Sequence, residues 1–347
     1  HCIPKPRVIR ESNLRRFVKC FSLMKVVFVG ATPQTAGIGG VAMHVERLVE
    51  ALKLRGENVV LADYKVSAVR SFMSCFRADV VHIHAQNKVF SYLMALWAKL
   101  CRAKVVYTLH ERYDTGDSLS CRFCNRMLRL CDAVITLNTQ SRDDIRERLG
   151  IESVLLPAFI PPTHTEPLDD EIMAVIGRAK DSGKMLCVTN AAYHTFGANG
   201  ETYGISFLVR YFQERPDCFL LISDPSGQNK AAIACDVPNV AFVPYKHSYY
   251  EVLKHADVSI RNTNTDGDAL SVKESLSLGV PTLCTDVVDR PEGAILFKYE
   301  DESSLTQALH EAQHHAKASV SFGNPVDDLL NIYHRRGIKG GGALEGN

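Results

Sequence analysis

In the second half of the chain, acidic residues and a predicted helix start form a pattern that suits a phosphorylated ligand. Asp268 is expected to be the N-cap of a helix, which leaves the N–H groups of Ala269 and Leu270 free to bind a phosphate. Asp266 precedes this helix, and Glu274, farther along it, could accept hydrogen bonds from both hydroxyls of a ribose. The alternative is a solvated helix start at which the acids are incidental.

A second candidate is His110, which follows the predicted strand 104–109 at the carboxyl edge of a sheet. A histidine there could donate a hydrogen bond to a sugar hydroxyl or a phosphate, or act as a general base. It could equally cap the strand and satisfy local backbone groups, and the sequence does not decide between these roles. For His82 and His84, at the preceding strand, we expect structural roles.

The segment from Gly37 to Ala42 is rich in glycine and follows the first predicted strand. Its backbone can approach an anionic or hydroxylated ligand closely, and Gly39 and Gly40 are the candidate binding residues. The spacing also fits a dinucleotide-binding turn, with Asp63 at the end of the next strand. Against this, the glycines stand too far beyond the strand to place a pyrophosphate on the helix dipole. A simple structural turn is the remaining alternative.

We expect neither a metal site nor a redox site. Cys121 and Cys124 form a Cys-x2-Cys pair, but a structural zinc site usually needs a second pair at suitable spacing. Free thiols on a helix are the favoured interpretation, with a redox dithiol as the alternative. No other cluster of metal ligands is visible in the sequence, so the expected chemistry is metal-independent and needs no cofactor.

Two series of alternating strands and helices must position these residues. Short β-branched runs alternate with helical patterns over 24–163 and again over 164–320, which is typical of βαβ units and parallel sheets. The proline-rich segment 157–162 is expected to link two Rossmann-like domains that face each other across a cleft. Residues 1–23 are expected to be a basic extension, and 321–347 a C-terminal helix and flexible tail. The predicted strands are 25–30, 58–63, 79–83, 104–109, 133–137, 153–156, 185–189, 218–222, 240–243, 258–260 and 282–285.

The composition of the 347 residues, 46% hydrophobic and 23% charged, is ordinary for a globular protein. No segment reaches the roughly 18 apolar residues of a membrane-spanning helix, no secretory signal is evident, and scattered cysteines suit a reducing cytosol. Residues 1–165 contain 24 Lys and Arg against 14 Asp and Glu, and the remainder 16 against 25. The basic half favours an anionic partner, such as the inner face of the cell membrane, unless the two halves simply attract each other.

Together these motifs resemble those of the family-4 glycosyltransferases, retaining enzymes of the GT-B fold that assemble bacterial polysaccharides and lipid-linked glycans. The resemblance covers residues 24–335. The family's Glu-x7-Glu motif falls on Asp266 and Glu274, so the first acid is one methylene shorter. The motifs that carry the resemblance are Gly39-Gly40, Tyr107-Thr-Leu-His110, the run Cys131–Asn138 and the stretch Asp266–Glu292.

The resemblance implies a UDP- or GDP-linked sugar donor held mainly by the second domain. Glu274 would bind the ribose, the amides of Ala269 and Leu270 would bind the diphosphate, and Asp266 would lie near the donor sugar. His110 would reach the donor sugar from the first domain. With His110 and Asp266 as catalytic residues, the implied donor-binding set is Gly39, Gly40, Asn190, Arg261, Asp268, Ala269, Leu270, Ser271, Glu274 and Arg290.

One departure from the family concerns positive charge. Members usually place an Arg and a Lys in the loop after the first strand of the second domain, where they neutralise the diphosphate. Residues 190–204 contain neither. Two phosphate charges cannot stay unpaired in a closed cleft at low cost, so Arg261 and Arg290 are the predicted substitutes, with Lys273 a weaker one.

The predicted function is transfer of a hexose or related sugar, with retention, from a nucleotide diphosphate to a hydroxyl of a glycan or lipid-linked acceptor. The missing cations motivate a second hypothesis, a catalytically silent GT-B subunit that binds a glycan or a partner enzyme. A third is an NAD(P)-dependent enzyme built on the glycine-rich segment and Asp63. We expect no nucleic-acid partner.

Overall fold

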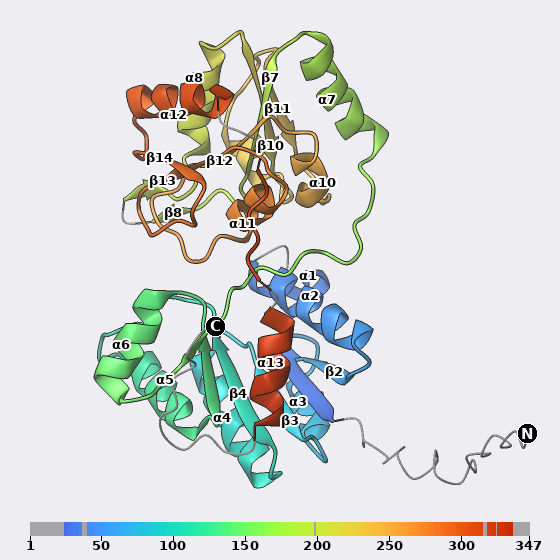
Figure 1. The fold of residues 1–347 in the computed structure, drawn as a ribbon, viewed down its shortest axis with the longest axis vertical. Helices are drawn as coiled ribbons and strands as arrows, with labels where there is room; N and C mark the ends of the chain where they lie inside the picture. Colours follow the sequence, from blue (N-terminus) through green and yellow to red (C-terminus); the bar gives the residue numbers. More distant parts are fainter. Residues whose placement is uncertain (1–23, 37–39, 198, 315–317, 324, 336–347) are drawn as a thin grey trace, which may run out of the picture.

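The computed structural model describes residues 24–36, 40–197, 199–314, 318–323 and 325–335, which form two α/β domains, one above the other in Figure 1. The predictions for Gly37, Gly39, the extension 1–23 and the tail beyond residue 335 lie outside the described residues. No helix in the described part of the chain is both long and apolar enough to cross a membrane.

The N-terminal domain is a six-stranded parallel sheet in the order β2-β1-β3-β4-β5-β6, with helices on both faces. Its strands are β1 (Lys25–Gly30), β2 (Asn58–Asp63), β3 (Val80–Ile83), β4 (Lys104–Leu109), β5 (Ala133–Thr136) and β6 (Val154–Leu155). Its helices are α1 (Pro33–Ala36), α2 (Gly40–Leu54), α3 (Ala68–Ser74), α4 (Lys88–Leu100), α5 (Leu119–Leu130) and α6 (Thr139–Leu149).

The C-terminal domain repeats this plan with a six-stranded parallel sheet in the order β11-β10-β7-β12-β13-β14. Its sheet strands are β7 (Met185–Asn190), β10 (Cys218–Ser223), β11 (Val240–Val243), β12 (Val258–Arg261), β13 (Thr282–Thr285) and β14 (Ala294–Phe297). A separate antiparallel pair is β8 (Phe196–Gly197) and β9 (Gly200–Glu201). The remaining helices are α7 (Asp170–Asp181), α8 (Ile205–Gln213), α9 (Gln228–Ala232), α10 (Tyr249–Leu253), α11 (Leu270–Ser277), α12 (Glu302–His314) and α13 (Pro325–His334).

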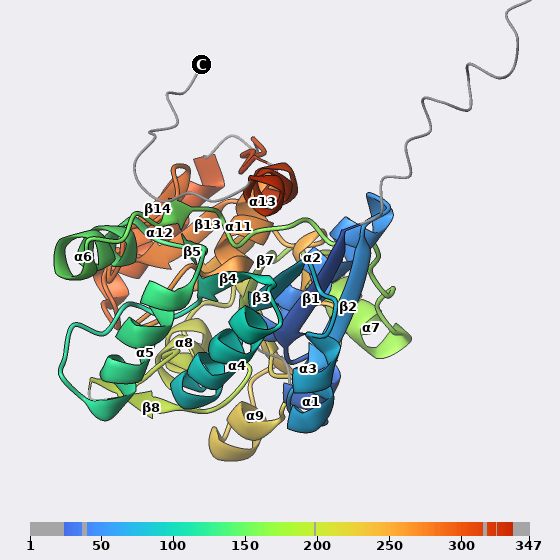
Figure 2. The same ribbon diagram turned by 90° about the horizontal axis from the view of Figure 1, so that it is seen from below.

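Two hydrophobic layers hold the N-terminal sheet, one on each face, because its strands are apolar on both sides. On one face α4 and α5 contribute Met94 and Met127, and α3 packs Phe72 against the same layer. On the other face α2 contributes Leu48 and α13 contributes Leu329. Figure 2 shows the sheet between α13 on one side and α3, α4 and α5 on the other.

The helix α13 follows the C-terminal domain in sequence but packs on the N-terminal domain, where Figure 1 shows it in red against the lower sheet. Tyr333 Oη hydrogen-bonds His82 Nδ1 at 2.6 Å, and Lys104 Nζ donates to the carbonyl of Ile332 at 2.5 Å. The chain therefore crosses between the domains twice, once through 157–162 and once before α13. The two crossings touch, because the rings of Phe159 and Phe322 lie 5.6 Å apart.

The predicted architecture of two parallel α/β domains is confirmed, and each predicted strand corresponds to an observed one within a residue or two. The strand β14 and the pair β8–β9 were not predicted. β14, which follows the turn 286–293, consists of only four residues, and β8 and β9 have two residues each, too few for a periodic pattern.

Candidate functional site

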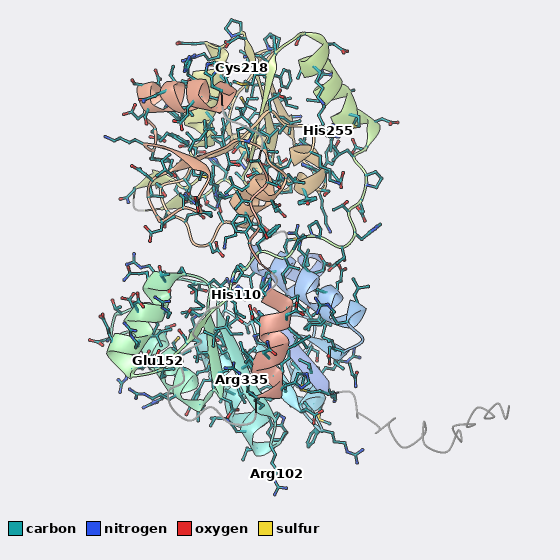
Figure 3. The ribbon with its side chains drawn as sticks, viewed as in Figure 1. Arg102, His110, Glu152, Cys218, His255 and Arg335 are labelled. Atoms are coloured by element: carbon teal, nitrogen blue, oxygen red, sulfur yellow. The ribbon has the colours of Figure 1, made fainter. Side chains whose placement is uncertain are left out.

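A cavity of about 610 Å³ lies between the two domains and is lined by residues of both. It opens where the carboxyl ends of β4, β7 and β12 meet the start of α11, as expected for facing parallel sheets. In Figure 3 His110 lies at the edge of the lower domain that faces the upper one. The predicted site residues that line the cavity are Gly40, His110, Asn190, Arg261, Asp266, Asp268, Ala269, Leu270, Ser271 and Glu274.

Helix α11 presents its N-terminal turn to this cavity, through Ala269, Leu270 and Ser271. The first N–H groups of any helix have no intrahelical acceptor, so this end of α11 is suited to bind an anion. The prediction of Asp268 as N-cap is wrong. The N-cap is Ala269, which has no capping side chain, and Asp268 instead accepts from Lys273 Nζ at 2.5 Å and from the N–H of Ala158 at 3.2 Å.

Glu274 lies one turn farther along α11 and is 4% exposed. Its Oε1 accepts a hydrogen bond from an η nitrogen of Arg47, on α2 of the other domain, at 2.5 Å. Burial raises the pKa of Glu274, and the positive charge of Arg47 opposes that shift. The carboxylate predicted to bind a ribose is thus occupied, in this structure, by a cation from the facing wall.

Asp266 is held between two arginines of its own domain. Its carboxylate accepts from Arg261 Nε at 3.0 Å and from an η nitrogen of Arg290 at 2.7 Å. Burial pushes the pKa of Asp266 upward, but the two guanidinium groups outweigh it and leave that pKa below its ordinary value. Asp266 is therefore a buried anion that positions two cations.

The two predicted substitutes for the family's cations differ in position. Arg261 lines the cavity and stacks on the ring of Tyr203, with 4.9 Å between the guanidinium carbon and the ring centroid. The side chain of Arg290 is 3% exposed and donates to Asp266 and to the carbonyl of Thr285. It lies behind Asp266 instead of on the cavity wall, so the expectation that Arg290 faces the cleft is wrong.

Opposite α11, three histidines from separate elements meet at the N-terminal wall: His44 on α2, His84 after β3 and His110 after β4. His84 Nδ1 and His110 Nε2 lie 2.9 Å apart, and the carbonyl of Ala158 accepts from His44 Nδ1 at 2.7 Å. Burial lowers the pKa of His44 and lowers those of His84 and His110 further. At neutral pH this wall therefore presents uncharged imidazoles, which can donate to or accept from sugar hydroxyls.

Among the described residues, these three histidines are also the one group compact enough to hold a metal ion, with nitrogen atoms within 4.8 Å of one another. This grouping was not predicted, because the three residues are far apart in the chain and meet only through the sheet. The contact between His84 and His110 already uses one nitrogen of each ring. Cys121 and Cys124 lie on α5 as free thiols, as predicted.

The glycine-rich segment does not favour a dinucleotide turn. Gly40 begins α2 and lines the cavity, but a short helix, α1, intervenes between β1 and α2. The carboxylate of Asp63, the acid such a turn would use for ribose, accepts from Thr35 Oγ1 at 2.5 Å and from the N–H of Thr32 at 3.3 Å. Asp63 is thereby engaged in the local turn.

Two cations of the cavity were not predicted. Arg47 is 6% exposed, and Lys246, which follows β11, is exposed. Helical periodicity could not find Arg47, because its side chain falls outside the apolar stripe that Val45, Leu48, Val49 and Leu52 form on α2.

Comparison with known proteins fits this geometry. Residues 62–163 match the family model described as "Glycosyltransferase Family 4". The resemblance to family-4 glycosyltransferases is confirmed. The architecture is the GT-B fold, two Rossmann-like domains that face each other across a cleft. Among curated protein sequences none matches the chain.

Several solved structures share the fold at low sequence identity. The HepE protein of Anabaena, solved with UDP and glucose, has a TM-score of 0.61 at 11% identity over 84% of this chain and 90% of that one. Sucrose-phosphate synthase of Thermosynechococcus elongatus has a TM-score of 0.60 at 14% identity, over 89% of this chain and 95% of that one. UDP-GlcNAc 2-epimerase of Methanocaldococcus jannaschii has a TM-score of 0.57 at 11% identity, over 89% of this chain and 99% of that one. The fold is thus shared by transferases and an epimerase, so the chemistry must be argued from the site.

Proposed function

We propose that this protein is a retaining glycosyltransferase that moves a sugar from a UDP- or GDP-linked donor to a hydroxyl of a glycan or lipid-linked acceptor. The observation that carries the proposal is the interdomain cavity, with the N-terminal turn of α11 and Glu274 on one wall and His110 on the other. A helix end suits a diphosphate, a buried carboxylate suits a ribose, and a neutral imidazole suits a sugar hydroxyl. The family match over residues 62–163 and the UDP bound to HepE support the same assignment.

The proposed reaction is a front-face displacement that retains the configuration at the sugar. The bond between the sugar's anomeric carbon and the β-phosphate oxygen breaks, and the acceptor oxygen bonds to that carbon on the same face. The departing phosphate oxygen takes the acceptor's proton. The protein contributes orientation, through His110 and α11, and stabilises the negative charge that develops on the diphosphate. Closure of the cleft would exclude water and limit hydrolysis of the donor.

A second candidate is a catalytically silent GT-B subunit. It is favoured by one observation, that Glu274, Arg261 and Arg290 are all engaged in ion pairs within the protein. The two candidates differ in whether the cavity binds a nucleotide sugar at all.

Calorimetric titration of UDP, GDP and their glucose conjugates tests the proposal. We expect one of the nucleotides to bind the wild-type protein, and Glu274→Gln to weaken it about tenfold or more, because an amide cannot accept from both ribose hydroxyls. Glu311→Gln, at an exposed position on α12, is the matched control and should bind like the wild type. Absence of binding by every nucleotide would favour the silent subunit, and chelator-sensitive turnover would contradict metal-independent chemistry.

The proposal extends to a peripheral position on the cytoplasmic face of an anionic membrane, where a lipid-linked acceptor of polysaccharide biosynthesis would be presented. Its support is the basic first half of the chain, whose exposed arginines include the labelled Arg102 at the far end of the lower domain in Figure 3. We expect binding to vesicles with anionic lipid that weakens as salt is raised. Equal binding to vesicles of neutral lipid would contradict this part of the proposal. The other exposed arginines of the domain include Arg70, Arg77, Arg122, Arg126 and Arg129.

A further inference from the structure

Arg47 is a buried cation that is incompletely satisfied. It belongs to α2, in the N-terminal domain, and its side chain is 7% exposed. One η nitrogen donates to the carbonyl of Ile160 at 3.2 Å and the other to Glu274 at 2.5 Å. Its Nε is buried and has no hydrogen-bond partner among the described residues. Because an unmatched donor of a buried charged group is costly, this arrangement suggests that a further acceptor enters the cavity.

The other cations near the cavity are committed or hydrated. Arg261 and Arg290 both donate to the single carboxylate of Asp266, and Lys273 donates to Asp268, so each of these cations is paired with a carboxylate of its own domain. Lys246 lines the cavity but is exposed, so water screens its charge. The loop 190–204 supplies no Arg or Lys. Arg47 is therefore the buried cation of the cavity whose partner, Glu274, has another proposed role.

Arg47 is also close to the anion-binding end of α11. Its partner Glu274 lies four residues after Leu270, which is about 6 Å along a helix and on the same helix face. The cavity is lined by Arg47 and by the first turn of α11 together. A diphosphate held by the amides of that turn would thus lie within reach of the guanidinium group.

We infer that Arg47 supplies, from the N-terminal domain, the positive charge that neutralises the donor's diphosphate, and that it leaves Glu274 to do so. This rests on the proposed function. When the nucleotide sugar binds, Glu274 turns to the ribose hydroxyls and Arg47 turns to the phosphate oxygens, where Nε and an η nitrogen can donate as a fork. The ion pair between the walls is exchanged for two ligand contacts. Without donor, the same pair holds the two domains together and fills the site.

The experiment compares ligands that share the ribose but differ in phosphate. Calorimetry with UDP, GDP, uridine, guanosine and inorganic pyrophosphate is performed on the wild type, on Arg47→Gln and on Lys53→Gln. Lys53→Gln is the control, because it also removes one positive charge from α2 but at an exposed position. We expect Arg47→Gln to weaken diphosphate and pyrophosphate binding about tenfold to a hundredfold. Nucleoside binding should be unchanged or tighter, because Glu274 is released. Lys53→Gln should bind every ligand like the wild type.

The double variant Arg47→Gln/Glu274→Gln, which removes both buried charges, distinguishes a fold defect from a lost contact. It should show the same loss of pyrophosphate binding, with a thermal unfolding midpoint closer to that of the wild type than Arg47→Gln has. Wild-type affinity of Arg47→Gln for UDP, GDP and pyrophosphate would overturn the inference while the proposed function stands. Arg47-dependent pyrophosphate binding without any nucleotide binding would support the anion site and overturn the proposed function. Failure of the wild type to bind either would overturn both.

Discussion

The two walls of the cleft handle charge in opposite ways. On the C-terminal wall, Asp266 is paired with Arg261 and Arg290, so these three charged groups find their partners inside one domain. On the N-terminal wall the histidines are kept neutral by burial, and the buried cation Arg47 finds its carboxylate on the facing domain. The Asp266 cluster is thus organised by the fold of its own domain, whereas Arg47 is paired with a carboxylate only when the two domains meet.

This difference has a physical cause in how the two sets of groups avoid the cost of burial. A buried carboxylate between two arginines stays charged because Coulomb attraction and hydrogen bonds outweigh desolvation. The buried imidazoles avoid the same cost by giving up their protons, and for His44 burial outweighs the opposing charge of Asp268. The walls should therefore respond differently to pH and to loss of a single charge.

The largest expected effect is on stability at mildly acid pH and belongs to the N-terminal wall. Burial lowers the pKa values of His44, His82, His84 and His110, whereas the unfolded chain takes up these protons near pH 6.5. Below that pH the unfolded state binds more protons, so the free energy of unfolding falls by about 1.4 kcal/mol per pH unit for each histidine that stays neutral. Above about pH 6.5 both states leave these histidines neutral, so the free energy of unfolding keeps its full value.

Guanidinium chloride unfolding between about pH 7 and pH 5 measures this slope. In the variant His84→Gln the slope of the unfolding free energy against pH should fall by roughly the contribution of one histidine. The variant His310→Gln, at an exposed position on α12, should keep the wild-type slope. An unfolding free energy that stays constant over this range would show that the imidazoles are not held neutral by burial.

The next largest effect tests the C-terminal wall. Asp266→Asn leaves Arg261 and Arg290 buried without a counter-charge, and we expect the free energy of unfolding to fall by about 3–5 kcal/mol. Asp289→Asn, an exposed change in the nearby turn, is the control and should leave the unfolding curve in place. A small effect of Asp266→Asn would mean that the arginines find acceptors elsewhere and that this wall is not self-contained.

The smallest effect distinguishes the roles of the two walls in catalysis. His110→Gln should lower turnover about a hundredfold and leave donor affinity near that of the wild type, since His110 is proposed to act on the sugar in the transition state. His255→Gln, which Figure 3 places within the upper domain away from the cleft, is the matched control. Loss of donor affinity with unchanged turnover would assign His110 to ground-state binding instead.

The alternation of apolar strands and amphipathic helices in the sequence was sufficient to predict two parallel α/β domains and the cleft between them. Strands such as β1, β4 and β13 were predicted with their observed bounds, because a fully buried parallel strand needs a continuous apolar run. The motif residues Asp266 and Glu274 were found from their spacing and from resemblance, and both line the cavity.

The sequence could not predict which side chains pair with one another. It indicated Asp268 as a cap, whereas the fold uses that carboxylate to hold Lys273 and the linker at Ala158. It offered Arg261 and Arg290 as free cations, whereas both are bound to Asp266. These partners depend on packing between elements, and several lie far from each other in the chain.

The amino-acid sequence alone thus determined the fold and the segments that border the cleft, because hydrophobic periodicity and helix ends are local properties of the chain. Only the tertiary structure decided that Arg47 meets Glu274, that three histidines meet at one wall, and that α13 completes the first domain. Those contacts join residues from different domains or distant strands. Burial then sets the charge of each group, and burial exists only once the chain has folded.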